Sequence, residues 1–329
     1  MNILVVGAGS IGERHTRAFR QIEGVQVAIV DVRVDRAQEV AERYGCLGWY
    51  ADLAAAPLQE FDGAVIATSA NLHIPLGRQC AEAGLHLLME KPLATGLAGA
   101  GELIELCRQK GLVLAVGYTL RFHPVLLKVK ELLGKGAAGR LLSLQLSCAH
   151  HLPISRPDYR SIYYGAPGMG GGAILDLSHE INYAEWLLGP LRLECSRCAA
   201  VPELGLAGEA IADLLLTSED GVPVNIHLHM ADRRVRRQCY IAGSEASIAG
   251  DFIAGEVVLQ QAPDRLERFE CKSERDSWHR SEALDFLEAV RTRSRPRCTG
   301  EEALQTLRLC LEAMQKGIPQ PSLSPRSPS

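Results

Sequence analysis

The sequence predicts an α/β protein with two domains, a doubly wound parallel sheet followed by a mostly antiparallel sheet. Up to about residue 120, short apolar runs alternate with helix-like segments, as in parallel sheets with right-handed crossovers. Beyond residue 121, long extended stretches with short connections replace this alternation, which is typical of antiparallel strands. A chain of 329 residues is also too long for one ordinary core, so two domains are expected.

The individual elements follow from these patterns. In the first domain, strands are expected at 2–6, 25–31, 63–67, 85–90 and 112–117, separated by helices that include 35–44, 72–83 and 97–110. In the second domain, a helix at 124–133 precedes extended stretches at 140–149, 191–202, 209–217, 222–230 and 235–243, and amphipathic segments follow at 281–293 and 301–316. The expected domains are residues 1–121 and 122–317, and the Pro- and Ser-rich residues 318–329 are expected to be a disordered tail.

The first predicted strand ends in a glycine-rich turn. Gly7, Gly9 and Gly12 form a complete G-x-G-x-x-G, and a helix-like stretch follows at once. Ser10 and Ile11 stand between its last two glycines. Such glycines allow a tight turn, a close approach of the backbone to a pyrophosphate and close packing of helix on strand, while the helix N-terminus attracts the phosphates. The turn therefore predicts a dinucleotide-binding domain.

The second predicted strand ends in Asp31. A carboxylate about 20 residues after the glycine turn accepts hydrogen bonds from the ribose hydroxyls of the adenosine. It would repel a 2′-phosphate, so NAD is favoured over NADP as the cofactor. Arg33 lies close by in the sequence and is the residue that would receive such a phosphate if the loop turned suitably.

A lysine follows another apolar run of the first domain. Glu90-Lys91-Pro92 comes directly after residues 86–89, which are expected to form a buried parallel strand. The carboxyl ends of such strands form the edge at which open α/β sheets bind their ligands. If a nicotinamide ring lies there, Lys91 is placed to meet the substrate beside it.

The second domain holds one dense group of polar residues. Gly170-Gly171-Gly172 precedes a predicted helix that runs to about Leu188. Asp176, His179 and Tyr183 share one side of this helix, opposite an apolar stripe. An Asp one turn from a His orients the imidazole and tunes its proton affinity. The trio is therefore either part of a catalytic site, which the glycine run favours, or a partly buried hydrogen-bonded group that fixes the helix.

The composition excludes several classes of protein. A net charge of −4 and a hydrophobic content of 47% describe a soluble globular protein with no nucleic-acid surface. The arginines at 233, 234, 236 and 237 are expected to lie on a solvated strand edge. No apolar segment reaches the roughly 18 residues that a membrane span needs, and the first strand leaves no room for a signal peptide, so a cytoplasmic protein is expected.

No metal site is expected from the sequence. Most of the 10 cysteines are scattered singly in apolar segments, where a thiol acts as a small hydrophobe. Cys195 and Cys198 form one C-x-x-C without a second pair, and in an extended segment they would point to opposite faces. His227 and His229 share one face of a predicted strand and are expected to be surface or interface residues.

Together these motifs resemble the glucose–fructose oxidoreductase/inositol dehydrogenase (Gfo/Idh/MocA) family. The resemblance rests on the G-x-G-x-x-G turn, on Glu90-Lys91-Pro92, and on the glycine run followed by Asp176 and His179. Three further stretches are similar to that family, namely 12–15, 67–73 and 116–124. The likeness covers about residues 1 to 316.

The resemblance implies an N-terminal Rossmann domain and a C-terminal α/β domain whose large open sheet joins subunits into a homodimer or homotetramer. Lys91 matches the catalytic lysine, in a Lys91–Pro92 bond that the family can make cis. Thr68, Asn71 and His73 match the loop along the cofactor, and Glu90 contacts the nicotinamide side. Independently of the resemblance, the Pro-rich approach to the glycine run offers Tyr159, Arg160 and Tyr163 either as sugar contacts or as residues of a solvated loop. Arg121 and Tyr183 are further candidate substrate contacts.

This chain departs from the family pattern in two places. Many members place the histidine four residues after the aspartate, whereas Asp176 and His179 are three apart, a spacing similar to that of a subgroup encoded with surface-sugar biosynthesis. Tyr183 stands where an acid is common, which puts a sugar contact at that position in doubt.

The expected function is NAD(P)-dependent hydride transfer between the nicotinamide and a secondary alcohol or ketone of a sugar, polyol or nucleotide sugar. His179 would accept the hydroxyl proton while Lys91 polarises the oxygen and Asp176 holds one of them in place. In the alternative assignment, Lys91 is the base. Two other functions are consistent with the same residues, a non-catalytic NAD(H) sensor and a reductase of a C=C or C=N bond.

Overall fold

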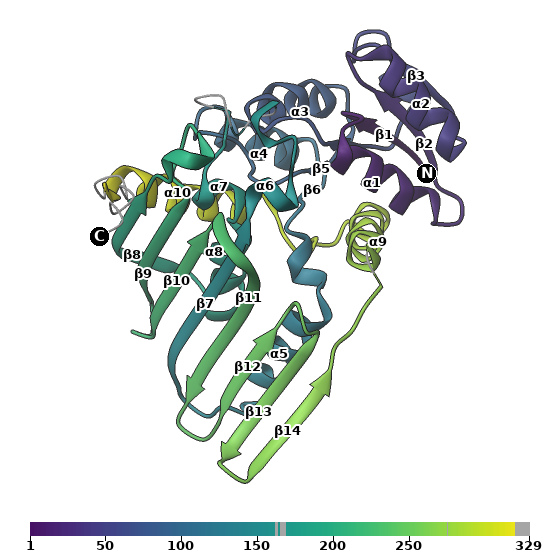
Figure 1. The fold of residues 1–329 in the computed structure, drawn as a ribbon. Coiled ribbons are helices and arrows are strands. Elements are labelled where there is room, and N and C mark those ends of the chain that lie inside the picture. The colour runs from purple at the N-terminus through teal and green to yellow at the C-terminus, as the bar shows by residue number, and fades with distance from the viewer. Residues whose placement is uncertain (162–163, 165–168, 275, 320–329) are drawn as a thin grey trace. The chain divides into compact units, whose positions relative to one another are not determined.

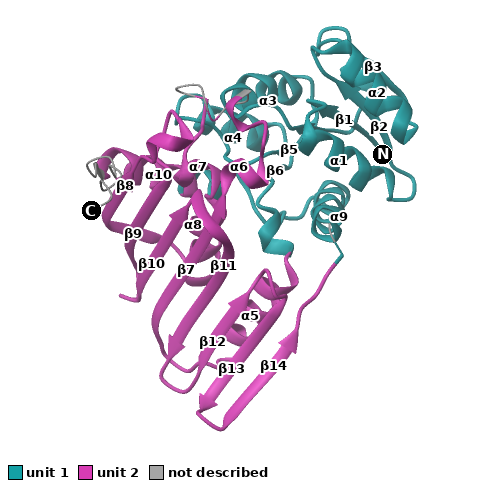
Figure 2. Cartoon of the chain, viewed as in Figure 1, with its two compact units in different colours: residues 1–122, 274–305 teal, residues 123–273, 306–329 magenta. Residues whose placement is uncertain are grey.

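The computed structural model describes residues 1–161, 164, 169–274 and 276–319 (Figure 1). The chain forms two compact units (Figure 2). Unit 1 comprises residues 1–122 and 274–305, and unit 2 comprises residues 123–273 and the chain from 306 on. Of the disordered tail expected at 318–329, the first two residues instead form a short strand, β15 (Ile318–Pro319), and the rest lies outside the described residues.

Unit 1 is built on a six-stranded parallel sheet with the strand order β3-β2-β1-β4-β5-β6. This order, which reverses beside β1, is that of a Rossmann fold, and it confirms the predicted doubly wound sheet. The short strand β3 was not predicted because Gly-Trp-Tyr is too brief to show a periodic pattern. The strands are β1 (Asn2–Val6), β2 (Gln26–Val30), β3 (Gly48–Tyr50), β4 (Gly63–Ile66), β5 (His86–Met89) and β6 (Leu114–Val116).

Helices connect these strands and bury them. Because both faces of a parallel sheet are covered, its strands are apolar throughout, and all residues of β4 and β5 are buried. A 3₁₀ turn, η3 (Thr119–Phe122), ends the first segment of unit 1. The connecting helices are α1 (Ser10–Arg20), α2 (Val34–Tyr44), α3 (His73–Glu82) and α4 (Ala100–Gln109).

Helix α9 (Ser277–Thr292) returns from the far end of the chain to unit 1. Its apolar face joins the core of the parallel sheet, where Phe286 meets Phe19 edge-on at 6.3 Å between ring centroids. A Cβ atom on Gly63 of β4 would lie 3.1 Å from the Phe286 ring, so helix and strand are in close contact. The sequence assigns this helix to the second domain, and that assignment differs from the structure because an amphipathic pattern does not say which sheet its apolar face will cover.

Unit 2 contains a nine-stranded sheet with the order β14-β13-β12-β11-β7-β10-β9-β8-β15. All neighbours are antiparallel except the pairs β7–β10 and β8–β15, so the predicted mostly antiparallel sheet is confirmed. The strands are β7 (Leu141–His151), β8 (Leu191–Ala199), β9 (Ile211–Ser218), β10 (Pro223–His229), β11 (Ala231–Gly243), β12 (Ser247–Asp251), β13 (Glu256–Ala262), β14 (Arg265–Glu270) and β15 (Ile318–Pro319).

One face of this sheet is buried under helices. Helix α8 (His179–Leu188) packs on β7, β8 and β10, and α5 (Pro124–Gly134) packs on β12 and β13. The burial along β7 alternates, with Leu144 and Leu146 buried while Gln145 between them is exposed. Unit 2 also contains the short helices α6 (Leu152–Ser155) and α7 (Ala173–Asp176) and the part of α10 (Gly300–Lys316) from residue 306 on.

The polar clusters of the second domain lie partly where the sequence puts them. The imidazole of His227 donates to Asp213 at 2.6 Å, and its ring centroid lies 5.7 Å from that of His229, so both histidines share one face of β10. The arginine cluster lies on β11, which is an inner strand and not an edge. Its last member, Arg237, pairs with Glu180 and is only 22% exposed, so the prediction of a solvated edge was wrong there.

Among the helices of the described segments, none combines the length and apolar character required to cross a membrane. The ten cysteines all lie in described residues, and none of them forms a disulfide.

Candidate functional site

The glycine turn after β1 has the geometry that its motif predicts. Gly7 has a positive φ of 105°, and a Cβ atom there would lie 2.6 Å from the carbonyl oxygen of Ala67. A Cβ atom on Gly12 would lie 1.8 Å from the carbonyl oxygen of Gly7. At Gly9, by contrast, the position of a Cβ atom has no atom within 4 Å, which leaves space beside the first turn of α1. The turn therefore fits a pyrophosphate at the helix N-terminus.

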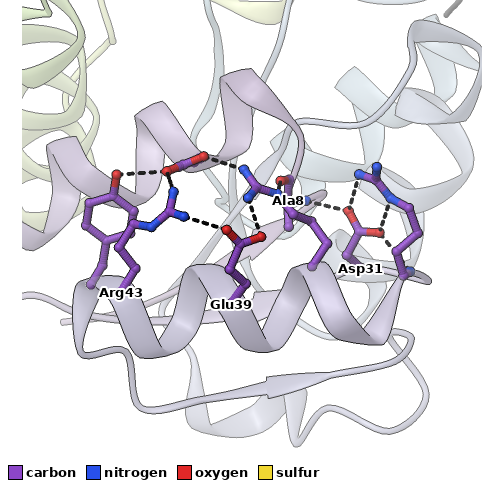
Figure 3. Close-up of polar contacts among 8 residues, drawn as sticks. Ala8, Asp31, Glu39 and Arg43 are labelled. Carbon is purple, nitrogen blue, oxygen red and sulfur yellow. Dashed lines mark hydrogen bonds and ion pairs between the residues drawn. The ribbon is translucent and has the colours of Figure 1, made fainter. Parts of the chain in front are cut away.

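Asp31 follows β2 and faces the glycine turn (Figure 3). Its carboxylate accepts hydrogen bonds from the Ala8 amide at 2.6 Å and from the Arg33 amide at 2.9 Å, and the Arg33 guanidinium lies within 3.4 Å. Burial alone would raise the pKa of Asp31, but the hydrogen bonds from Arg33 and Ala8 outweigh it and lower the pKa. The residue is therefore an ionised acceptor at the position where the motif expects one.

A network of ion pairs joins α1 to α2 next to Asp31 (Figure 3). Arg36 donates to the carbonyl oxygen of Ala8 at 3.0 Å and pairs with Glu13 and Glu39. Arg43 also pairs with Glu13, at 2.6 Å. These contacts fix the helix that starts at the glycine turn, so they support its geometry.

Lys91 lies one residue beyond the buried acid Glu90, at the carboxyl end of β5. The Lys91–Pro92 peptide bond is cis, as the family resemblance implies. Glu90 is 7% exposed; one of its oxygens lies 2.6 Å from Nε2 of His15, and the other accepts from the Lys91 amide at 3.1 Å. A Cβ atom on Gly117, after β6, would lie 3.1 Å from the Glu90 carboxylate. Close packing and hydrogen bonds thus hold the backbone of Lys91 through Glu90.

The loop after β4 is joined to the same segment by His73. Its ring nitrogens lie 2.9 Å from the carbonyl oxygen of Pro92 and 3.1 Å from that of Thr68. Burial lowers the pKa of His73, so the ring is neutral and donates to one of these carbonyls at a time. Thr68 is partly buried and Asn71 is exposed. Within unit 1 the structure therefore connects the predicted cofactor loop to the Glu90-Lys91-Pro92 segment.

Asp176 and His179 lie on either side of a helix break in unit 2. The predicted continuous helix is instead two helices, since α7 ends at Asp176 and α8 begins at His179. Ser178 is completely buried at the start of α8, whereas Asp176 and His179 are both partly exposed. The charge of Asp176 also opposes the burial that lowers the pKa of His150, at the end of β7. The prediction of one helix was wrong, although both side chains remain accessible.

The glycine run before α7 serves packing inside unit 2. Gly172 has a φ of 123°, and a Cβ atom there would lie 2.9 Å from the Glu209 carboxylate, which accepts from the Ile174 amide at 2.8 Å. A Cβ atom on Gly208 would lie 2.8 Å from the carbonyl oxygen of Gly171. The close approach that the glycines allow is therefore to residues 208–209 of the same unit, which is a structural role.

The candidate substrate contacts have partners within their own units. Tyr183 is completely buried, and its ring stacks on that of Phe252 with 5.8 Å between the ring centroids. Arg121, 2% exposed, donates to Glu302 at 2.9 Å. Tyr159 donates to the carbonyl oxygen of Leu204 at 2.9 Å, and the exposed Arg160 lies over the Tyr159 ring. Tyr163 lies outside the described residues. A substrate role for Arg121, Tyr159 or Tyr183 would require a buried side chain to change partners.

Sequence reasoning missed the residues behind Glu90. His15 belongs to a stretch that resembles the family, but Glu282 and His279 come from α9 and carry no motif. One ring nitrogen of His15 and one carboxylate oxygen each of Glu90 and Glu282 lie within 4.8 Å of one another. The 2.6 Å separation in the His15–Glu90 pair is that of a direct hydrogen bond between the two groups.

Comparisons with known proteins agree with this geometry. Residues 1–118 match the family described as "Oxidoreductase family, NAD-binding Rossmann fold", and residues 126–249 match the "GFO/IDH/MocA C-terminal domain". The chain is 28% identical to the myo-inositol 2-dehydrogenase of Thermotoga maritima over 94% of each chain. It is 30% identical to a dTDP-3,4-didehydro-2,6-dideoxy-α-D-glucose 3-reductase of Streptomyces antibioticus, with 86% of this chain and 82% of the relative covered.

A solved structure shares the fold. The UDP-N-acetylglucosamine 3-dehydrogenase of Acidithiobacillus ferrooxidans superposes with a TM-score of 0.82 at 23% identity, over 96% of this chain and 97% of the other.

Proposed function

The chain belongs to the GFO/IDH/MocA family of oxidoreductases, and we propose that it transfers hydride between the nicotinamide of NAD(P) and a secondary alcohol or ketone of a sugar, polyol or nucleotide sugar. The observation that carries this proposal is that one parallel sheet bears both the glycine turn, after β1, and Lys91, after β5. Both follow the carboxyl ends of their strands, the edge at which such sheets bind ligands.

Different residues of unit 1 would bind different parts of the cofactor. The amides of Ser10 and Ile11 at the start of α1 would hold the pyrophosphate, while Asp31 would accept hydrogen bonds from the ribose hydroxyls. This ionised acid would repel a 2′-phosphate, so we favour NAD over NADP. The family resemblance matches Thr68, Asn71 and His73 to the loop along the cofactor and assigns Glu90 to the nicotinamide side.

Side chains accept the hydroxyl proton of the substrate and stabilise the charge on its oxygen. When the nicotinamide accepts the hydride, the carbinol carbon becomes a carbonyl only if the hydroxyl proton leaves, so a base must lie within hydrogen-bond reach. We assign this base to His179 and assign to Lys91 the stabilisation of the negative charge that develops on the oxygen. Asp176 would orient His179. The reverse assignment, with Lys91 as the base, uses the same residues.

The function is tested by following the absorbance of the reduced nicotinamide while inositols, free sugars and nucleotide sugars are added to the protein with NAD or NADP. We expect saturable turnover of at least one of them. Saturable binding of the cofactor without turnover of any such compound would contradict the proposal and would favour a sensor of the same fold.

We propose in addition that copies of the chain associate through the sheet of unit 2, as the family resemblance implies. Its support is the alternation along the strands, which puts exposed residues such as Leu215 and Tyr240 on the face opposite the buried core. Sedimentation velocity should find a dimer or tetramer, and Leu215→Glu should shift it towards the monomer. A wild-type chain that sediments as a monomer at all concentrations would exclude this assembly.

A further inference from the structure

A cluster of ionisable side chains is buried behind the backbone of Lys91. His15 comes from α1, Glu90 follows β5, and His279 and Glu282 come from α9, all within unit 1. Each of the four is at most 7% exposed. The ring centroids of His15 and His279 lie 6.1 Å apart. One ring nitrogen of His15 and one carboxylate oxygen each of Glu90 and Glu282 lie within 4.8 Å of one another. The cluster is thus assembled from three segments that are far apart in the sequence.

The two carboxyl groups of the cluster are in different situations. Glu90 is hydrogen-bonded to His15 and to the Lys91 amide. Glu282 is 3% exposed, and both of its oxygens are buried without a hydrogen-bond partner among the described residues. A charged carboxylate in such a place would be strongly disfavoured, particularly with a second carboxylate beside it. The geometry therefore favours one negative charge in the pocket, on Glu90.

The surroundings of Glu282 reinforce this distribution of charge. Burial, followed by the charges of Glu90 and of Asp285 on its own helix, raises the pKa of Glu282 well above its ordinary value. Burial opposes ionisation of Glu90 as well, but the hydrogen bond and the charge of His15, followed by the charge of Lys91, lower its pKa.

Four basic groups on α1, η3 and α9 are either neutral or paired with other acids. Burial, followed by the charge of His15, lowers the pKa of His279 to about 3, so this ring is neutral. Arg14 and Arg17 of α1 pair with Asp276. On η3, which also packs on α9, Arg121 pairs with Glu302. The negative charge of Glu90 is stabilised by His15 and Lys91, whose charges lower its pKa.

We propose that Glu282 is a positioning residue for Lys91: as a neutral acid it leaves Glu90 the one carboxylate in the pocket, and Glu90 in turn holds the Lys91 backbone. This rests on the proposed role of Lys91 in catalysis. Ionisation of Glu282 would place two like charges within 4.8 Å in a buried pocket and would push Glu90 away from His15 and from the Lys91 amide. Because the neutral form is lost as the pH rises, turnover should fall on the alkaline side while NAD affinity stays constant.

The kinetic test compares Glu282→Gln with the wild type and with Glu288→Gln, an exposed glutamate on the same helix. Glutamine has the shape of the neutral acid but cannot ionise. We expect kcat at neutral pH to stay within about twofold and the alkaline fall in kcat to move up by about one pH unit or more, with no such shift in Glu288→Gln. An unchanged pH profile in a folded Glu282→Gln enzyme would overturn the proposal.

A second test needs no substrate and so separates this inference from the proposed function. The infrared difference spectrum of the wild type minus Glu282→Gln at neutral pH should show the C=O stretch of a protonated carboxyl group, because the variant lacks this group. The absence of this band from the wild-type spectrum would overturn the proposal. So would stoichiometric binding of Zn²⁺ or Mn²⁺ that Glu282→Gln abolishes, because the cluster would then be a metal site.

Discussion

Asp31 and Glu90 are both acids that follow a strand of the same parallel sheet, yet they are held in different ways. The partners of Asp31 are Ala8 and Arg33, and the Arg33 side chain is 61% exposed. The partner of Glu90 is the buried His15, with Glu282 and His279 of α9 close behind. The two carboxylates are similarly buried, at 8% and 9% exposure, but the partner side chain of Asp31 can turn into solvent, whereas that of Glu90 is part of the core. The comparison separates an acid that binds from an acid that positions its neighbour.

The largest expected effect concerns the core around Glu90 and leaves the surroundings of Asp31 unchanged. Phe286→Ala removes a fully buried ring from α9, the helix that carries Glu282, and should lower the free energy of unfolding by about 3–5 kcal/mol. Urea unfolding measures this change, with the partly exposed Leu284→Ala on the same helix as control. Equal, small losses in both variants would mean that α9 does not complete the core of unit 1.

A smaller effect is expected when Glu90 keeps its shape and loses its charge. Glu90→Gln weakens the charge-assisted hydrogen bond to His15, which should lower the free energy of unfolding by about 2 kcal/mol. The matched change Asp31→Asn should lower it by less than about 1 kcal/mol, because its partner Arg33 is 61% exposed and solvent weakens an ion pair with such a partner. If both variants lost the same stability in urea, the two acids would not differ in the way described.

Asp31 should instead control the choice of cofactor. Asp31→Ala removes the acceptor for the ribose hydroxyls and frees Arg33, so it should weaken NAD and raise the relative use of NADP by about tenfold, equal to about 1.4 kcal/mol. The ratio of kcat/KM for the two cofactors measures this change. A ratio that does not move would remove Asp31 from the ribose.

The smallest expected effect concerns acid pH. Although burial opposes ionisation, the hydrogen bonds of Arg33 and Ala8 lower the pKa of Asp31. Its carboxylate therefore stays charged at pH values below about 3.9, the ordinary pKa of an aspartate. NAD binding that depends on this charge should be constant from pH 7 down to about 5 and weaken only in stronger acid. Calorimetric titration tests this, with Asp31→Asn as control. A loss of affinity near pH 6 that is absent from Asp31→Asn would contradict it.

The sequence predicts local features of this molecule well. The glycine turn and Asp31 lie within one βαβ unit, so spacing alone gives their arrangement. The strands β3, β12, β13 and β14 were missed because they are short or lack a clear run of apolar residues. The break after Asp176 was also missed, since the helical periodicity continues through it.

Contacts between distant segments could not be predicted. Glu282 reaches Glu90 only because α9 covers the first sheet, and the apolar pattern of α9 would suit either sheet. The glycine run before α7 favours a catalytic interpretation of the trio on the following helix, because the sequence does not reveal that Glu209 occupies the space beside the run. Burial likewise separates the candidate substrate residues, since Tyr183 and Arg160 differ in exposure in a way that their types do not show.

Comparing Lys91→Ala with Lys110→Ala, an exposed lysine of the same unit, tests the central claim most directly. Turnover is measured with the best substrate found, and NAD affinity by calorimetry. We predict that Lys91→Ala lowers kcat by about 10³-fold or more while the Kd of NAD changes by no more than a few-fold, and that Lys110→Ala changes neither. A Lys91→Ala enzyme that keeps most of its rate would contradict the account.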